Sequence, residues 1–225
     1  MIRQTVTGSG GLAPERYLYN YLIEGVPFEQ CIVPARANLD VLCSNRRTVQ
    51  AESILMGETL REMAFRNFFG SVDEQYDVVI IDVSPSINLL QTCAIVYTRR
   101  ILVPVAMDPL SFQGARASIE TANSLNQLLK TDIRAVAILP VMVHRRMVMT
   151  EMVLSGLEDL SQQTGIPLLP SIRTDATVSK AARQKQFLAD FEPNCKAYQD
   201  YRVAADALTT ILRDELRDRE TAAGA

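Results

Sequence analysis

Four continuous apolar runs constrain the fold of this chain more than any other feature. They cover residues 78–83, 101–106, 133–143 and 167–172, and they are rich in valine, isoleucine and leucine. Strands without apolar and polar alternation are buried on both faces, and strands that alternate with helices form parallel sheets through right-handed crossovers. The sequence therefore predicts an α/β fold, a doubly wound and mostly parallel sheet with flanking helices.

Helical patterns and turn residues fill the rest of the chain. Apolar residues recur at helical spacing, and Gly25 and Gly70 mark the ends of the first two helices. We find no repeat, linker or domain boundary, so we expect one domain over residues 1–216 and a flexible tail over 217–225. The predicted helices cover residues 13–25, 48–69, 111–130, 147–164 and 194–216, and short β-type segments cover 31–34 and 39–44.

The composition limits which kinds of protein this chain can be. Hydrophobic residues make up 48% and charged residues 22%, which is enough for a sizeable core and excludes global disorder. The pI of about 5.3 gives no global basic signature, so any contact with DNA must be a local patch. The 4 cysteines form no C-x-x-C pair, which favours reduced thiols in a cytoplasmic protein. No apolar run approaches the roughly 20 residues that span a membrane.

Polar residues stand at or near the end of each apolar run. Asp82 follows the first four residues of the first run, Asp108 comes two positions after the second run, His144 follows the third, and residues 173–175 follow the fourth. Each alone also fits a strand end that meets water. Because ligands bind at the carboxyl ends of parallel strands, their coincidence predicts a phosphate and metal site at one edge of the sheet. A carboxylate behind a rigid buried strand, as at Asp82, is suited to ordering Mg²⁺ through a water molecule.

The stretch YDVVIIDVSPSINLLQTCAIV, residues 76–96, resembles the central motif of the ParA/Soj/MinD family of deviant Walker ATPases. That motif begins with YD, runs through the apolar Walker B strand to D-x-P-P-S, and closes with L-x-x-N-A-L. Ser84 stands where the family commonly has its first proline. The residues that match the motif are Asp77, Asp82, Pro85, Ser86, Leu90 and Ala94.

Four further segments resemble the family in the same order. Residues 101–114 resemble its V-x-V-P-V strand and the following loop, and residues 142–146 its M-x-D-R-R-T turn, with His144 in place of the acid. Residues 172–181 and 191–201 resemble the two closing segments, with Lys196 at a usual glycine. The resemblance covers most of the chain and implies a P-loop NTPase fold of the SIMIBI type.

The resemblance implies a partition or positioning protein that serves plasmid or chromosome segregation. Family members bind ATP and Mg²⁺, form ATP-dependent homodimers, bind DNA without sequence preference at the nucleoid, and hydrolyse ATP when a ParB-like adaptor stimulates them. Asp82 would hold Mg²⁺ through water. The implied cofactor-binding residues are Asp82, Ser84, Pro85, Arg173, Thr174 and Asp175.

Local positive charge is compatible with contacts to DNA phosphates. Each of the cations concerned also fits a solvated surface position. The DNA-binding candidates are Arg145, Arg146, Lys180, Arg183 and Lys185.

The phosphate-binding loop of the family, K-G-G-x-G-K-T/S, has no match here. The first lysine is Lys130, and no Gly-Lys dipeptide occurs. Residues 4–10 align with the end of the family's second strand, so we expect the first βαβ unit to be missing and apolar flanks of residues 78–83 to be exposed. Without the loop we expect no measurable ATP hydrolysis.

Two explanations compete for the missing loop. Either the sequence begins at an internal methionine of a longer protein, which we favour, or it is a natural relative without the loop. An in-frame K-G-G-x-G-K-T upstream would support the first, and a stop codon would contradict it.

Two other functions stay open. The chain could be a non-catalytic interaction module that pairs with a complete ATPase or a ParB-like adaptor. A MinD-like membrane positioner is disfavoured, because residues 205–217 carry mixed charge where a basic amphipathic helix is needed. We expect the methionines around the predicted 147–164 helix to pack inside: Met142, Met147, Met149 and Met152.

Overall fold

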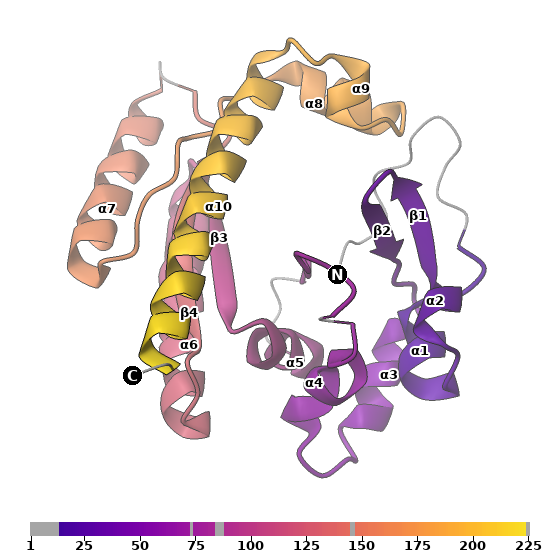
Figure 1. The fold of residues 1–225 in the computed structure, drawn as a ribbon. Helices are drawn as coiled ribbons and strands as arrows, with labels where there is room; N and C mark the ends of the chain where they lie inside the picture. The colour runs from indigo at the N-terminus through magenta and orange to yellow at the C-terminus, as the bar shows by residue number, and fades with distance from the viewer. Residues whose placement is uncertain (1–13, 73, 84–87, 145–146, 224–225) are drawn as a thin grey trace. The chain divides into compact units, whose positions relative to one another are not determined.

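The computed structural model describes residues 14–72, 74–83, 88–144 and 147–223, which form two compact units. Unit 1 takes the chain up to Thr98 and adds Ala182–Phe187, and unit 2 takes Arg99–Ala181 and the chain from Leu188 on. Figure 1 draws the elements of each unit. The single domain over residues 1–216 stays a prediction.

Unit 1 is mainly helical and contains one antiparallel hairpin. The hairpin pairs β1 (Ile32–Arg36) with β2 (Leu39–Leu42), with Ile32 opposite Leu42, which confirms the two short β-type segments. The helices of unit 1 are α1 (Leu18–Glu24), α2 (Phe28–Cys31), α3 (Thr48–Leu55), the 3-10 helix η1 (Arg61–Met63), α4 (Ala64–Phe69) and α5 (Leu89–Thr98).

Aromatic rings build the core of unit 1. Phe65 is buried, and its ring centroid lies 5.3 Å from that of Phe69, which lies 5.2 Å from that of Tyr21. The prediction of one helix over residues 48–69 is wrong. Leu60 has a left-handed φ of 56°, which interrupts the helical hydrogen-bond series between α3 and η1.

The apolar run at residues 78–83 differs from the buried strand that the sequence predicts there. It forms no strand with any described residue, and Val78 and Ile80 are 65% and 77% exposed. A strand needs the N–H and C=O groups of a neighbouring strand, and no described backbone offers them here. The prediction of a buried strand is therefore wrong, whereas the expected exposure of apolar side chains in this run is confirmed.

Unit 2 has the parallel architecture that the sequence predicts. Strand β3 (Arg100–Ala106) pairs in parallel with β4 (Arg134–Val141). Helices α6 (Pro109–Leu129) and α7 (Val148–Thr164) cover one face of this pair, where Val105 and Leu157 are fully buried. Helix α10 (Lys196–Ala223) packs on the other face through Ala204 (Figure 1).

The fourth apolar run follows β4 without becoming a regular strand. Parallel bridges join Ile138 to Leu168 and Val143 to Arg173, and Leu169 donates its N–H to the Ile138 carbonyl at 2.9 Å. Pro167 and Pro170 lack the N–H that a continuous ladder needs. The run therefore extends the parallel sheet by isolated bridges.

Helix α10 is tied to the sheet by ion pairs near its far end. Arg100 of β3 donates from Nε to Glu215 at 2.6 Å and from Nη2 to Asp132 at 2.8 Å. The helix continues through residues 217–223, where the sequence predicts a flexible tail. Helices α8 (Ala176–Arg183) and α9 (Leu188–Phe191) lie between the fourth run and α10 in the chain.

Candidate functional site at the carboxyl edge of the parallel sheet

Residues 173–175 lie at the carboxyl end of β4. The bridge from Val143 to Arg173 closes the parallel pairing, and Thr174 donates its N–H to the Val143 carbonyl at 3.0 Å. These hydrogen bonds hold the start of the loop against the end of the strand. The structure thus places the three residues at the edge where parallel sheets bind ligands.

The Arg173 side chain is bound by Asp200 of α10. Its Nε and Nη2 donate to the two carboxylate oxygens of Asp200, each at 2.8 Å, and its backbone N–H donates to the same carboxylate at 3.0 Å. The side-chain hydrogen bond to Asp200 raises the pKa of Arg173. This paired geometry fixes the loop to α10, so two guanidinium nitrogens are already engaged within the protein.

Asp175 caps two helices at once. Its Oδ1 accepts from the Thr177 N–H at 2.9 Å at the start of α8, and its Oδ2 accepts from the Ala197 N–H at 3.3 Å at the start of α10. Hydrogen bonds from Thr177 lower the pKa of Asp175. A carboxylate suits both positions, because the first N–H groups of a helix have no partner within the helix.

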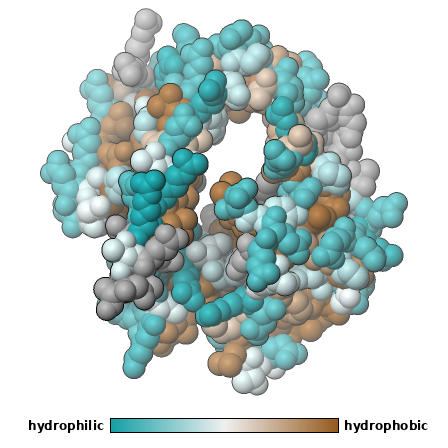
Figure 2. All heavy atoms as spheres, viewed as in Figure 1, coloured by the Kyte–Doolittle hydropathy of each residue, from teal (hydrophilic) through white to brown (hydrophobic). Residues whose placement is uncertain are grey.

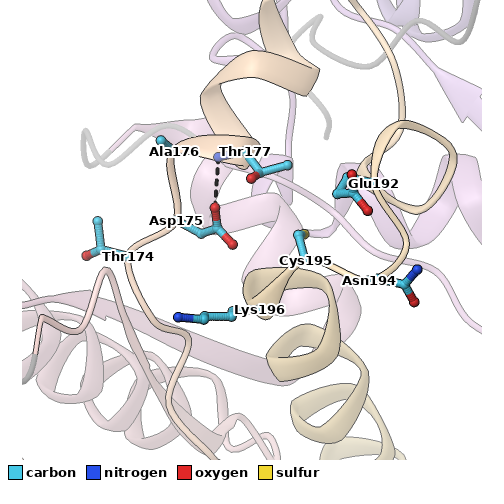
Figure 3. Close-up of a pocket in the computed structure, with 8 residues that line it drawn as sticks. All are labelled: Thr174, Asp175, Ala176, Thr177, Glu192, Asn194, Cys195 and Lys196. Carbon is cyan, nitrogen blue, oxygen red and sulfur yellow. Dashed lines mark hydrogen bonds between the residues drawn. The ribbon is translucent and has the colours of Figure 1, made fainter.

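An open pocket of about 480 Å³ lies between the starts of these two helices (Figure 3). Its wall carries both signs of charge, with Asp175 and Glu192 opposed by Lys196. The pocket is lined by both closing segments that resemble the family, residues 172–181 and 191–201. Glu192, Asn194 and Lys196 were not predicted as site residues, and the resemblance of residues 191–201 was the only signal in the sequence that pointed to them. The lining residues are Thr174, Asp175, Ala176, Thr177, Glu192, Asn194, Cys195 and Lys196.

The acid after β3 has a structural role in unit 2. Asp108 is the N-cap of α6, where Oδ1 accepts from the Ser111 N–H at 2.9 Å and Oδ2 from the Ser111 hydroxyl at 2.6 Å. These two hydrogen bonds lower the pKa of Asp108. His144 is exposed after the end of β4.

The remaining predicted residues have separate places in the chain. Asp82 belongs to unit 1 and is exposed, so its role in ordering Mg²⁺ stays a prediction. Lys180 and Arg183 are exposed and stand three positions apart on α8, which puts them on one helix face, and the exposed Lys185 follows. Four predicted residues lie outside the described part of the chain: Ser84, Pro85, Arg145 and Arg146.

The described residues at this edge of the sheet do not make up a complete site for ATP and Mg²⁺. Among the described residues, no group of three or more His, Cys, Asp or Glu side chains could hold a metal ion. The sequence has no Gly-Lys loop to cradle phosphates, and the pocket beside Asp175 supplies one lysine against two carboxylates. Within the same described part of the chain, no helix has the length and apolarity needed to cross a bilayer.

The fold places this chain among α/β proteins of the P-loop NTPase type. In comparisons with solved structures, the ATP complex of a McdA variant from Cyanothece is similar with a TM-score of 0.76 and 15% identity, over 89% of this chain and 77% of that one. At this identity the likeness concerns the fold alone.

The model of the AAA_31 family, described as an AAA domain, matches residues 4–135. The chain belongs to this family and is of the ParA/MinD type, which confirms the resemblance seen in the sequence.

Two curated relatives are similar to this chain. The cell division protein PomZ of Myxococcus xanthus is 35% identical over 114 residues, which cover 50% of this chain and 36% of PomZ. The sporulation initiation inhibitor protein Soj of Bacillus subtilis is 26% identical over 133 residues, 59% of this chain and 53% of Soj. The chain thus spans less than two thirds of either relative.

Proposed function

We propose that this chain is part of a ParA-type partition or positioning protein, which places a plasmid, a chromosome or another cargo in the cell. The match of residues 4–135 to the AAA_31 family carries the proposal, and the relatives PomZ and Soj support it. The test is to tag the full gene product, delete it, and follow cargo position by microscopy. Normal cargo position and inheritance after deletion would contradict the proposal.

The residues proposed for nucleotide binding are those that the family resemblance implies. Asp82 would order Mg²⁺ through water, and Ser84, Pro85 and residues 173–175 would contact the nucleotide. The ATP in the McdA neighbour supports nucleotide as the ligand class. For the 225-residue chain alone we expect no measurable hydrolysis, because its sequence holds no Gly-Lys loop. Mg-ATPase activity above background that Asp82→Ala abolishes would overturn this expectation.

Non-specific DNA and a ParB-like adaptor are the proposed partners, with a homodimer as the binding form at the nucleoid. The exposed cations Lys180, Arg183 and Lys185 support the DNA contact, and Arg145 and Arg146 stay candidates. Replacing Lys180, Arg183 and Lys185 by alanine should weaken DNA retention by the full-length protein and reduce its dependence on salt.

The matched control for this experiment is Arg116→Ala, which removes an exposed cation from α6. It should leave DNA retention unchanged. A comparable loss in the control would mean that surface cations in general, and not those at residues 180–185, govern retention. Retention that does not respond to salt would contradict phosphate contacts altogether.

A second candidate function is a non-catalytic interaction module that pairs with a complete ATPase or a ParB-like adaptor. The exposed apolar residues Val78 and Ile80, which lack a strand partner among the described residues, favour it. Co-purification with either partner should be lost in the Val78→Ser, Ile80→Ser double variant. It should persist in Val203→Ser, a change at another exposed valine. Loss of co-purification in both variants would show that residues 78–83 are not the specific contact with the partner.

A further inference from the structure

Two segments of unit 1 that are far apart in the sequence meet at the tip of the β1–β2 hairpin. One is the tip itself, residues 36–39, and the other is Ala182–Phe187, which contains the end of α8 and the turn before α9. The guanidinium carbon of Arg36 lies over the Phe187 ring, 5.0 Å from its centroid. This is a cation–π distance, and Figure 1 shows the hairpin tip beside the turn between α8 and α9.

Both segments turn sharply where they meet. Asn38 at the hairpin tip has a φ of 62°, and Lys185 has a φ of 55°. Lys185 also donates its N–H to the Ala182 carbonyl at 3.1 Å, which closes the turn after α8. Left-handed backbone of this kind reverses the chain within a few residues. The side chains at the meeting point therefore stand on two short, tightly folded stretches of backbone.

The charged residues of these two stretches are all positive. Residues 32–38 and 182–187 contain arginine and lysine but no aspartate or glutamate. The acid that follows in the hairpin, Asp40, accepts a hydrogen bond from the Tyr76 hydroxyl at 2.7 Å. Figure 2 shows mostly hydrophilic surface at the upper right, where these segments lie in Figure 1. Positive charge from two segments is thus concentrated at one place on unit 1. The exposed cations there are Arg36, Arg183 and Lys185.

The Phe187 ring restricts the orientation of the Arg36 guanidinium. A guanidinium that lies over a ring uses its face for that contact, and its N–H groups lie in its own plane and point past the edge of the ring. Lys185 stands two positions before Phe187, so their Cα atoms lie within about 7 Å of each other. An oriented guanidinium next to a lysine suits the phosphate backbone of a nucleic acid, whose oxygens accept paired N–H donors.

We propose that Arg36 of the hairpin is part of the DNA-binding surface, and that Phe187 positions its guanidinium against a backbone phosphate. We call Arg36, Arg183 and Lys185 together the hairpin patch. Arg36 donates to one phosphate, and the other two cations contact neighbouring phosphates. The inference rests on the proposed function, because it concerns the same DNA partner. It adds a residue from a segment in which the sequence predicts no DNA contact.

The first test measures binding of the full-length protein to a fluorescein-labelled DNA duplex over a series of salt concentrations. Arg36→Ala should weaken binding about fivefold near about 0.1 M salt, and it should lower the slope of log affinity against log salt by about one. Arg46→Ala is the matched control, because it removes an exposed arginine beyond the base of the hairpin. It should leave affinity and slope unchanged, and equal effects of the two variants would overturn the proposal.

The second test asks whether the ring positions the guanidinium. Phe187→Leu keeps every charge and removes the ring, and it should weaken binding about threefold. In the Arg36→Ala background the same change should have no further effect, because the group that the ring positions is gone. Arg36→Lys keeps the charge without the planar fork, so it should bind more weakly than the wild type. Wild-type affinity in Arg36→Lys, or an equal effect of Phe187→Leu in both backgrounds, would overturn the proposal.

Two further results separate this inference from the proposed function. If the variant that lacks Lys180, Arg183 and Lys185 loses affinity for DNA and Arg36→Ala does not, the inference alone fails. If the wild type itself does not bind the duplex, DNA is not a partner, and both fail. Competition by a polyglutamate peptide as strong as that by unlabelled duplex would also overturn the inference, because the hairpin patch would then bind carboxylates as well as phosphates. Thermal melts of Arg36→Ala should match those of the wild type, since the side chain is exposed.

Discussion

The runs at residues 78–83 and 101–106 look alike in the sequence and differ in the structure. Both are short, continuous and rich in valine. The second is β3, paired along its length with β4, and its Val105 is fully buried. The first has no strand partner among the described residues, and its Val78 is 65% exposed. Being a strand is thus a relation between two segments, which no pattern within one segment establishes.

The largest expected effect concerns the core of unit 1. Phe65→Ala should lower the free energy of unfolding by about 4 kcal/mol, because it empties the centre of the aromatic cluster. Val49→Ala, at an exposed position of α3, should change it by less than about 0.5 kcal/mol. Urea unfolding measures both changes.

Hydrogen exchange in the same Phe65→Ala variant tests the single-domain prediction. If both units unfold together, the amides of β4 in unit 2 should lose protection along with those of α4. Unchanged protection in β4 would mean that the two units are separate folding units.

The next prediction compares the two apolar runs directly. Val105→Ala should lower the free energy of unfolding by about 2 kcal/mol, because it leaves a cavity between β3 and α6. Val78→Ala should change it by less than about 0.5 kcal/mol, because the side chain is already in water. Val78→Ala is thus the control for Val105→Ala, because both remove the same atoms from a valine. Equal losses of stability in the two variants would show that residues 78–83 are buried in solution.

A smaller effect is expected at the double cap of unit 2. Asp175→Ala should cost about 1 kcal/mol at neutral pH, because α8 and α10 each lose an N–H acceptor. The pKa of Asp175 is lowered in the folded state, so its contribution is present above the usual carboxyl pKa and disappears as the pH falls through the lowered value. Thermal melts at a series of pH values should show that the variant loses less stability at acid pH than the wild type. Identical pH profiles would contradict a stabilising role of the Asp175 carboxylate at the two helix starts.

The smallest effect is expected at high pH in unit 1. Burial raises the pKa of Cys93 to about 11. A raised pKa means that its contribution is fully present below the ordinary thiol pKa and is lost as the pH rises toward the folded value. Cys93→Ala should flatten the stability profile in this alkaline window, as measured by thermal melts. An unchanged slope would show that other groups control the alkaline loss.

Sequence reasoning went furthest where a pattern and a partner coincide. Apolar runs and helical spacing predicted β3, β4, α6 and α7, because these elements pack on one another within unit 2. The same reasoning missed the break at Leu60, since a left-handed φ in leucine has no signature in the sequence. It also placed Met152 inside, because spacing reveals which face of a helix is apolar but not whether another element covers it.

The candidate site was predictable in part. Residues 173–175 follow an apolar run and lie at the carboxyl edge, as predicted. Their partners were not predictable, since Asp200 and Ala197 approach only through the packing of α10. Arg173, which the resemblance implies to be a cofactor-binding residue, is paired with the Asp200 carboxylate, and its cofactor role stays a prediction.

The ion pairs of α10 give this helix a mechanical role. Asp200 binds Arg173 at the carboxyl edge of the sheet, and Glu215, about 22 Å further along the helix axis, binds Arg100 at the opposite edge. Because one ion pair holds α10 at each edge of the sheet, we expect the helix to resist sliding of the strands past each other. We also expect a force applied at the loop of residues 173–175 to reach the start of β3 through α10.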